Sequence, residues 1–171
     1  MKKLPLRILM CILFASCGNN DKPTVSSSVR KAEDKKPIVE KVPVILDIKR
    51  IAGQSPKQVE KIIGLPDHKK PQRITDSPCG KLVCQQYTYR NEQLEIVFIN
   101  NKADWITIRK VNDFGFSQEV TEFLGLPNSA PDFVGSGVIR WKYVSGINEI
   151  SIFTDGNGGI DYFYILCDTP T

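Results

Sequence analysis

The chain has 171 residues, of which 41% are hydrophobic and 25% charged, a composition ordinary for a globular protein and unlike that of a multi-pass membrane protein or a wholly disordered chain. The formal net charge of +4 is uneven: residues 1–46 hold nine Lys/Arg and four Asp/Glu, whereas residues 47–171 hold fourteen and fifteen. Because the basic excess lies outside the second range, no nucleic-acid partner is expected for a domain formed there.

The first residues have the anatomy of a signal peptide. A basic n-region precedes an apolar run at 8–15, which is too short for a transmembrane helix. Residues 13–17, Leu-Phe-Ala-Ser-Cys, resemble a bacterial lipobox. The resemblance implies a signal peptide over 1–16 and acylation of Cys17, for example with palmitate. An ordinary secretory signal with a nearby free thiol is the alternative.

Residues 17–46 are predicted to form the lipidated start and a disordered tether, because they are polar, rich in Pro and Ser, and without sustained periodicity. Gly18, rather than Asp, follows Cys17. By resemblance to the enterobacterial sorting rule, this favours the outer membrane. The expected localisation is the cell envelope, with the protein lipid-anchored to a membrane and its domain in the periplasm.

Two segments sixty-one positions apart, 56–67 and 117–128, share one pattern of Val, two adjacent apolar residues, Gly, Leu and Pro. The apolar residues fall at i, i+3 and i+4, which predicts a short amphipathic helix in each segment. Each helix would begin after a serine and end at a glycine. These residues are Ser55 and Ser117 for the starts, and Gly64 and Gly125 for the ends.

Three strands are predicted after each helix, at 81–90, 92–100 and 103–110, and at 138–144, 147–154 and 159–167. Tyr87 aligns with Trp141, and the following apolar strands align, at one offset of 54. The predicted fold class is α+β: two tandem helix-plus-three-strand antiparallel units, 47–111 and 112–171, that form one domain. The pattern leaves open whether the two sheets are continuous.

This arrangement resembles the SmpA/OmlA (BamE-like) unit, in which a short helix ending in Leu/Ile-Gly-x-Pro precedes strands carrying Trp or Tyr and Ile-x-Ile-x-Phe. The resemblance covers residues 47–167. The unit occurs singly in outer-membrane assembly lipoproteins and in tandem in the β-lactamase inhibitor protein. It implies a binding task without catalysis, although one fold hosts different functions. The chain has two such patterns, unlike the assembly lipoproteins.

No catalytic or metal-binding arrangement is expected. His68 is the single histidine and is placed in a polar loop, without a second histidine or an apparent nucleophile. Residues 155–161, Asp-Gly-Asn-Gly-Gly-Ile-Asp, lack the ligand spacing of a calcium loop and are interpreted as a hairpin turn. Neither an enzymatic activity nor a cofactor is therefore predicted.

Three cysteines follow Cys17, namely Cys79, Cys84 and Cys167. In an oxidising periplasm, the favoured interpretation is a Cys79–Cys84 disulfide; a Cys84–Cys167 bridge is the alternative. The two cysteines at positions 79 and 84 are further apart than those of the redox motif C-x-x-C. The sequence therefore gives only weak support to an oxidoreductase activity.

Aromatic residues are the candidate partner-binding residues. Alternating aromatics on strands usually pack in the core, but Tyr162 and Tyr164 flank Phe163 and so place aromatics on both faces of one strand. Phe133 lies in a Pro- and Gly-rich loop and is a possible exposed anchor. The candidate residues for binding are Phe133, Trp141, Tyr162 and Tyr164.

Charge also divides the two predicted units. Residues 47–111 hold twelve basic and seven acidic groups, whereas residues 112–171 hold two and eight. Chance variation of solvated surfaces is one interpretation, and a dipolar surface that orients a partner is the other.

The leading hypothesis is a membrane-anchored periplasmic lipoprotein that acts as a non-catalytic protein-binding or envelope-assembly module, with a cell-envelope protein as its partner. The alternative is a tethered proteinaceous inhibitor of a periplasmic enzyme. The oligomeric state does not follow from the sequence.

Overall fold

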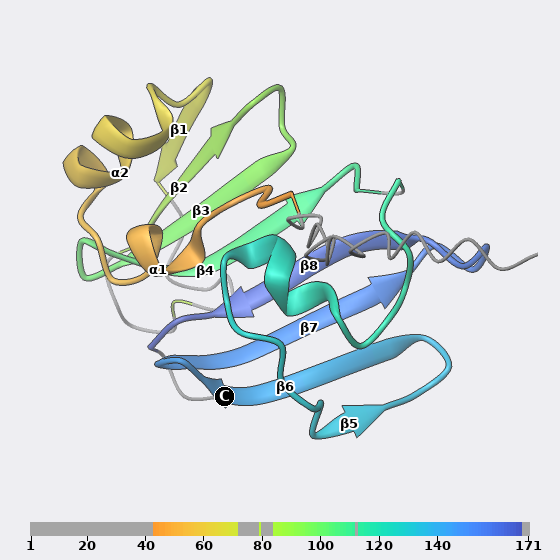
Figure 1. The fold of residues 1–171 in the computed structure, drawn as a ribbon. Coiled ribbons are helices and arrows are strands. Elements are labelled where there is room, and N and C mark those ends of the chain that lie inside the picture. The colour runs from red at the N-terminus through yellow and green to blue at the C-terminus, as the bar shows by residue number, and fades with distance from the viewer. Residues whose placement is uncertain (1–42, 72–78, 80–83, 112, 169–171) are drawn as a thin grey trace, which may run out of the picture. The chain divides into compact units, whose positions relative to one another are not determined.

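One antiparallel sheet dominates the computed structural model, which describes residues 43–71, 79, 84–111 and 113–168. All of these residues belong to the compact unit Glu40–Thr171. The sheet has eight strands in the order β1-β2-β3-β4-β8-β7-β6-β5 (Figure 1). The strands are β1 (His68–Pro71), β2 (Cys84–Tyr89), β3 (Leu94–Ile99), β4 (Lys102–Arg109), β5 (Phe133–Val134), β6 (Val138–Val144), β7 (Ile147–Thr154) and β8 (Ile160–Leu166).

The predicted fold class is wrong. The structure is mostly this eight-stranded sheet with two short α-helices, and it is not built from two helix-plus-three-strand units. β4 pairs with β8 and merges all strands into one sheet. Both strands bury side chains on two faces, which is typical of central strands rather than of the edges of two separate sheets.

The helices account for the second part of the error. α1 (Ile48–Ile51) was not predicted, and α2 (Pro56–Ile63) lies where a helix was expected. The second expected helix is only a five-residue 3₁₀ helix, η1 (Val120–Leu124). α2 begins with proline, and the Gln58 side chain accepts hydrogen bonds from the backbone N–H and hydroxyl of Ser55. η1 has neither feature, and its Thr121 and Phe123 have weak helix propensity.

The two hairpins β2–β3 and β6–β7 have corresponding registers. Tyr87 pairs with Ile96, and fifty-four positions later Trp141 pairs with Ile150. The periodicity of the strands therefore predicted six of the eight strands within three residues at each end, although it did not predict the architecture. β1 and β5 had no such signal, because all residues in both are exposed.

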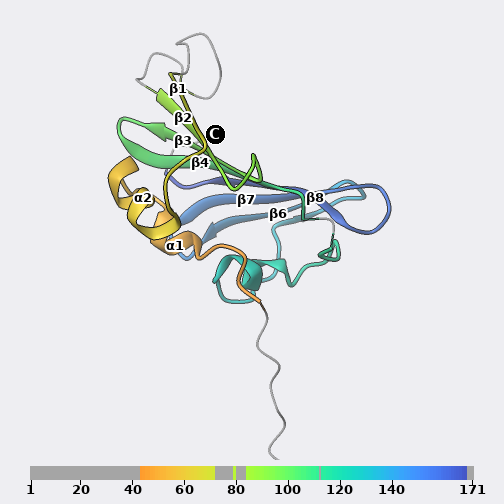
Figure 2. The ribbon, with the colours of Figure 1, turned by 90° about the horizontal axis from the view of Figure 1, so that it is seen from above.

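The main core lies on one face of the sheet. Figure 2 shows α1, α2 and η1 on the same side of the strands. Side chains from these helices pack on alternate residues of the strands, and the burial of this apolar surface is the main source of stability. The largest fully buried side chains include Trp141, Tyr89, Phe98, Phe163 and Ile106.

The folded part begins before residue 47. Leu46 is 5% exposed in the core, and the backbone N–H of Ile45 donates to the carbonyl of Phe123 over 2.9 Å. The last residues of the predicted tether are therefore part of the domain. Residues 1–42, with the predicted signal peptide, Cys17 and most of the tether, lie outside the described residues.

His68 does not lie in a loop, as the sequence predicted, but begins the edge strand β1. The run His-Lys-Lys-Pro has no apolar alternation, which is why the strand was missed. β1 is held to α2 by a 2.6 Å ion pair between Lys69 Nζ and Glu60 Oε1, and the Lys69 ammonium lies over the ring of Tyr87. The hydrogen bond to Glu60 is the largest cause of the raised pKa of Lys69. Charge and proline on an exposed edge strand oppose pairing with other chains.

Cys79 and Cys84 form a disulfide, as the sequence favoured. The alternative bridge from Cys84 to Cys167 is excluded, since Cys167 is a buried free thiol. Burial raises the pKa of the Cys167 thiol well above its ordinary value of 9.0. The neutral thiol therefore makes the stability of the folded state depend on pH. Its contribution is fully present below the pKa of Cys167 in the unfolded chain, and it is lost as the pH rises from that pKa through the higher pKa of the folded state.

We expect native Cys167 to resist alkylation by iodoacetamide at about pH 8 and to react quickly in denaturant, because the thiolate is the reactive form. Mass spectrometry of the peptide that contains Cys167 measures the modified fraction, with Cys167→Ser as the blank. Equal rates in buffer and in denaturant would show that the thiol is accessible in the native protein.

Candidate functional site

The face of the sheet opposite α1, α2 and η1 is the candidate functional site, and we call it the open face. Among the described residues no helix lies on it (Figure 2). Phe163 and Ile165 of β8 belong to the main core, so the alternate residues Tyr162 and Tyr164 point to the open face. Part of this face, near β2, is covered by a small cluster around the disulfide.

Four aromatic side chains form a strip across the open face, on three adjacent strands. Trp105 of β4 contacts Tyr164 edge to face, with ring centroids 5.4 Å apart. Tyr162 stacks on Phe153 of β7, with centroids 4.5 Å apart and an interplanar angle of 15°. All four are partly buried by each other and the sheet, so they present rings that are already held in place. We call Trp105, Phe153, Tyr162 and Tyr164 the aromatic strip.

A charged network borders the aromatic strip on β6 and β7. Arg140 Nε lies 3.0 Å from Glu149 Oε1 and donates to Ser151 Oγ over 3.0 Å. The hydroxyl of Ser151 in turn donates to Glu149 Oε1 over 2.9 Å. Glu149 and Ser151 are buried, whereas the side chain of Arg140 is 38% exposed. Burial raises the pKa of the neighbouring Tyr164, and the negative charge of Glu149 raises it further. The phenol of Tyr164 therefore stays a neutral hydrogen-bond donor.

A polar hollow of about 450 Å³ lies on the other side of the aromatic strip. Arg109 of β4 is paired in register with Tyr162 and reaches Glu95 Oε2 at 3.8 Å. The hollow therefore continues directly from the strip. Its lining residues are Lys70, Gln86, Thr88, Glu92, Glu95, Arg109, Lys110 and Asp161.

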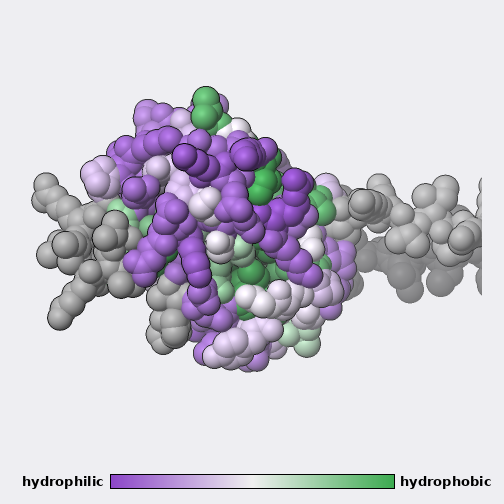
Figure 3. Space-filling view, turned by 90° about the vertical axis from the view of Figure 1, so that its left-hand side faces the viewer, coloured by the Kyte–Doolittle hydropathy of each residue, from purple (hydrophilic) through white to green (hydrophobic). Residues whose placement is uncertain are grey.

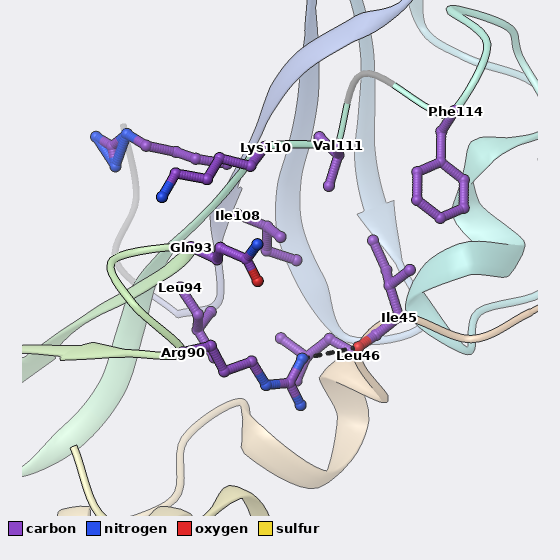
Figure 4. Close-up of a pocket in the computed structure, with 10 residues that line it drawn as sticks. Ile45, Leu46, Arg90, Gln93, Leu94, Ile108, Lys110, Val111 and Phe114 are labelled. Atoms are coloured by element: carbon purple, nitrogen blue, oxygen red, sulfur yellow. Dashed lines mark hydrogen bonds between the residues drawn. The ribbon is translucent and has the colours of Figure 1, made fainter. Parts of the chain in front are cut away.

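A second, apolar hollow of about 200 Å³ lies at the end of β4 and shares Arg109 and Lys110 with the polar one. Figure 4 shows Arg90, Gln93 and Lys110 on one side of it, and Ile45, Val111 and Phe114 on the other. Its remaining lining residues are Leu46, Leu94, Ile108 and Arg109. The sequence did not indicate this hollow, because its walls come from residues within the ranges 45–46, 90–94 and 108–114, which are far apart in the chain.

The four predicted binding residues are separated by the structure. Tyr162 and Tyr164 lie together in the aromatic strip. Phe133 is 51% exposed on the edge strand β5, so it is accessible but lies outside the strip. Trp141 is fully buried in the core, where its Nε1 donates to the carbonyl of Ser129 over 2.8 Å, and it takes no part in the open face. The alternation of β6 predicts a buried position for it.

The remaining chemical candidates are turns or surface groups. Asp155 Oδ1 accepts hydrogen bonds from the backbone N–H of Asn157 and of Gly159 and thereby holds the β7–β8 turn. The described part of the chain contains no group of three or more His, Cys, Asp or Glu that could hold a metal ion. Among the same residues, no helix is long and apolar enough to span a membrane.

The side of the molecule where α2 lies has a different character from the strip. Figure 3 shows it to be mainly hydrophilic, with hydrophobic residues in small separate groups. Leu65, 80% exposed after α2, is one isolated apolar residue of the described surface. Single apolar residues of this kind are normal on a protein surface and do not define a site.

Comparisons with protein-family models, curated proteins and solved structures give no match to this chain. The resemblance to the SmpA/OmlA unit therefore stays a prediction, and the function must be inferred from the site.

Proposed function

We propose that the chain is a membrane-anchored lipoprotein of the cell envelope whose domain binds a partner protein through the open face of its sheet, without catalysing a reaction. The observation that carries the binding part is the aromatic strip, a set of ordered rings on a face that no described helix covers. The anchor rests on the lipobox-like residues 13–17.

The composition of the open face suits a protein partner. Tyr, Trp and Arg are the residues that most often dominate the energy of protein interfaces. Here Trp105, Tyr162 and Tyr164 form the centre, with Arg140 and Arg109 on either side. Such side chains lose little conformational entropy on binding when neighbours already hold them. An interface of this kind would place rings at its centre and charged groups at its rim.

The open face is also more polar than a typical small-molecule site. Pockets for small ligands are enclosed and mainly apolar, whereas the polar hollow beside the strip is lined by charged and amide side chains. The strip itself is built on adjacent strands of a sheet, so it forms a continuous area rather than a cavity. A protein surface is the partner that can contact such an area at once.

Affinity purification of the full lipidated chain, cross-linked in its own membrane, tests this function. The double variant Tyr162→Ser/Tyr164→Ser is expected to recover at least about tenfold less partner than wild type, because it removes two central rings. Tyr143→Ser, which alters a tyrosine 80% exposed outside the strip, is the matched control and should recover wild-type amounts. Equal recovery by the double variant and wild type would contradict the proposal.

A further inference from the structure

The apolar hollow combines a hydrophobic floor with a cationic rim. Leu94 and Ile108 are part of the main core and line the hollow, together with Ile45 and Phe114. Its floor consists of core side chains that are almost fully buried, since Leu94 is 1% and Ile108 7% exposed, and its sides include the partly buried Ile45 and Phe114. A hollow of about 200 Å³ can hold one group of the size of a phenyl ring or a leucine side chain.

Three exposed cations line this hollow: Arg90, Arg109 and Lys110. Two of them bind backbone carbonyls in the structure. Arg90 Nη1 donates to the carbonyl of Ile45 over 3.2 Å, and Lys110 Nζ donates to that of Asn91 over 3.1 Å (Figure 4 shows the first). These bonds hold both side chains beside the opening and leave their positive charges available to an anion.

No acidic residue belongs to the described lining of the apolar hollow. The polar hollow differs, since Glu92, Glu95 and Asp161 lie among its cations. The cations of the apolar hollow would thus attract the carboxylate of a ligand, whereas the polar hollow next to it presents both positive and negative groups. This local excess agrees with the basic balance of residues 47–111.

We propose that the apolar hollow binds one large apolar side chain of the partner protein, phenylalanine or leucine in size, next to a carboxylate that the rim cations hold. This inference rests on the proposed function and adds to it the chemistry of the partner: an acidic segment with a single apolar anchor. The size argues for a protein rather than a lipid, because pockets for larger ligands measure roughly 300–1,000 Å³ and a long acyl chain exceeds this hollow.

The test uses 3-phenylpropionate, which carries a ring and a carboxylate, and its neutral analogue 3-phenylpropionamide. Both are titrated into the full chain in detergent, and backbone amide signals are followed by NMR. We expect saturable shifts at Leu94, Ile108 and Val111, and about fivefold tighter binding of the acid than of the amide, as an ion pair at an exposed rim would give.

Variants separate charge from shape. The double variant Arg90→Gln/Lys110→Gln is expected to lose this preference for the acid and to bind the amide as wild type does, which also shows that the hollow is intact. Lys102→Gln removes one positive charge at the opposite end of β4 and should leave both titrations unchanged.

Two results with 3-phenylpropionate would overturn the inference: no saturable shift around the hollow, or equal affinity of the wild type for the acid and its amide analogue. Saturable shifts of the same backbone signals with dodecanoate only would also overturn it, because they would indicate a lipid site. Because the purification described above depends on Tyr162 and Tyr164 of the open face, its failure is distinguishable from failure here. Equal partner recovery by wild type and the Tyr162→Ser/Tyr164→Ser variant, with 3-phenylpropionate binding intact, would count against the proposed function and not against the binding of an acidic, apolar group in this hollow.

Discussion

Replacing Trp141 by alanine is expected to lower the free energy of unfolding by about 3–5 kcal/mol. The side chain is fully buried in the main core, so its removal leaves a large cavity between β6 and the helices that cover it. It also removes the hydrogen bond from Trp141 Nε1 to the carbonyl of Ser129, 2.8 Å long. A loss of this size is a large part of the stability of an ordinary domain.

Urea denaturation followed by circular dichroism measures this loss. Trp141→Phe keeps a ring but not the donor, and about 1–2 kcal/mol of destabilisation is expected. Tyr143→Ala, on the same strand but 80% exposed, is the control and should change the stability by less than about 0.5 kcal/mol. A Trp141→Ala protein as stable as the control would mean that Trp141 does not lie in the core.

Replacing Arg140 by leucine is expected to destabilise the domain by about 2 kcal/mol. The change leaves the carboxylate of Glu149, 8% exposed, without its cation, and a buried charge that loses its partner is costly. The figure is lower than for a fully buried pair, because the side chain of Arg140 is 38% exposed and water screens part of the interaction.

The double variant Arg140→Leu/Glu149→Gln tests whether the unpaired charge is the cause. A glutamine can still accept the hydrogen bond from Ser151 Oγ but carries no charge, so the double variant should regain more than half of the lost stability. The same urea titration measures all three proteins. A double variant no more stable than Arg140→Leu would show that Arg140 acts through packing alone.

Alternation of apolar residues predicted the strands that line the core. In β6, for example, Ile139 and Trp141 face the core while Arg140 and Lys142 do not, and the bounds Val138–Val144 match the prediction. This worked because burial of one face imposes a period of two on the sequence. The disulfide was also predictable, since Cys79 and Cys84 are close in the chain and an oxidising compartment was expected.

The sequence pattern did not predict which distant strands pair with each other. The contact of β4 with β8 joins Arg109 to Tyr162, fifty-three residues apart, and nothing in either strand alone specifies its neighbour. The Val and Gly-Leu-Pro pattern shared by the two helical segments led to the wrong prediction of a second α-helix. A pattern of apolar residues does not distinguish an α-helix from a short 3₁₀ helix such as Val120–Leu124.

The candidate site was predictable in part. The alternation around Phe163 indicates that Tyr162 and Tyr164 leave the core, and they do lie on the open face. Their neighbours Trp105 and Phe153 come from other strands and became visible only with the sheet order. Trp141, predicted as a binding residue, is buried; the alternation of β6, which places it on the same face as Ile139, indicated the core.

Photo-cross-linking from the open face tests the proposed function most directly. A photoreactive phenylalanine analogue is placed at Tyr162 in the aromatic strip, or at exposed Lys57 of α2 on the opposite side, in the full chain in its own membrane. We expect one defined protein adduct from position 162, which the additional change Tyr164→Ser diminishes, and none from position 57. An adduct from position 57 alone, or equal adducts from both positions, would contradict it.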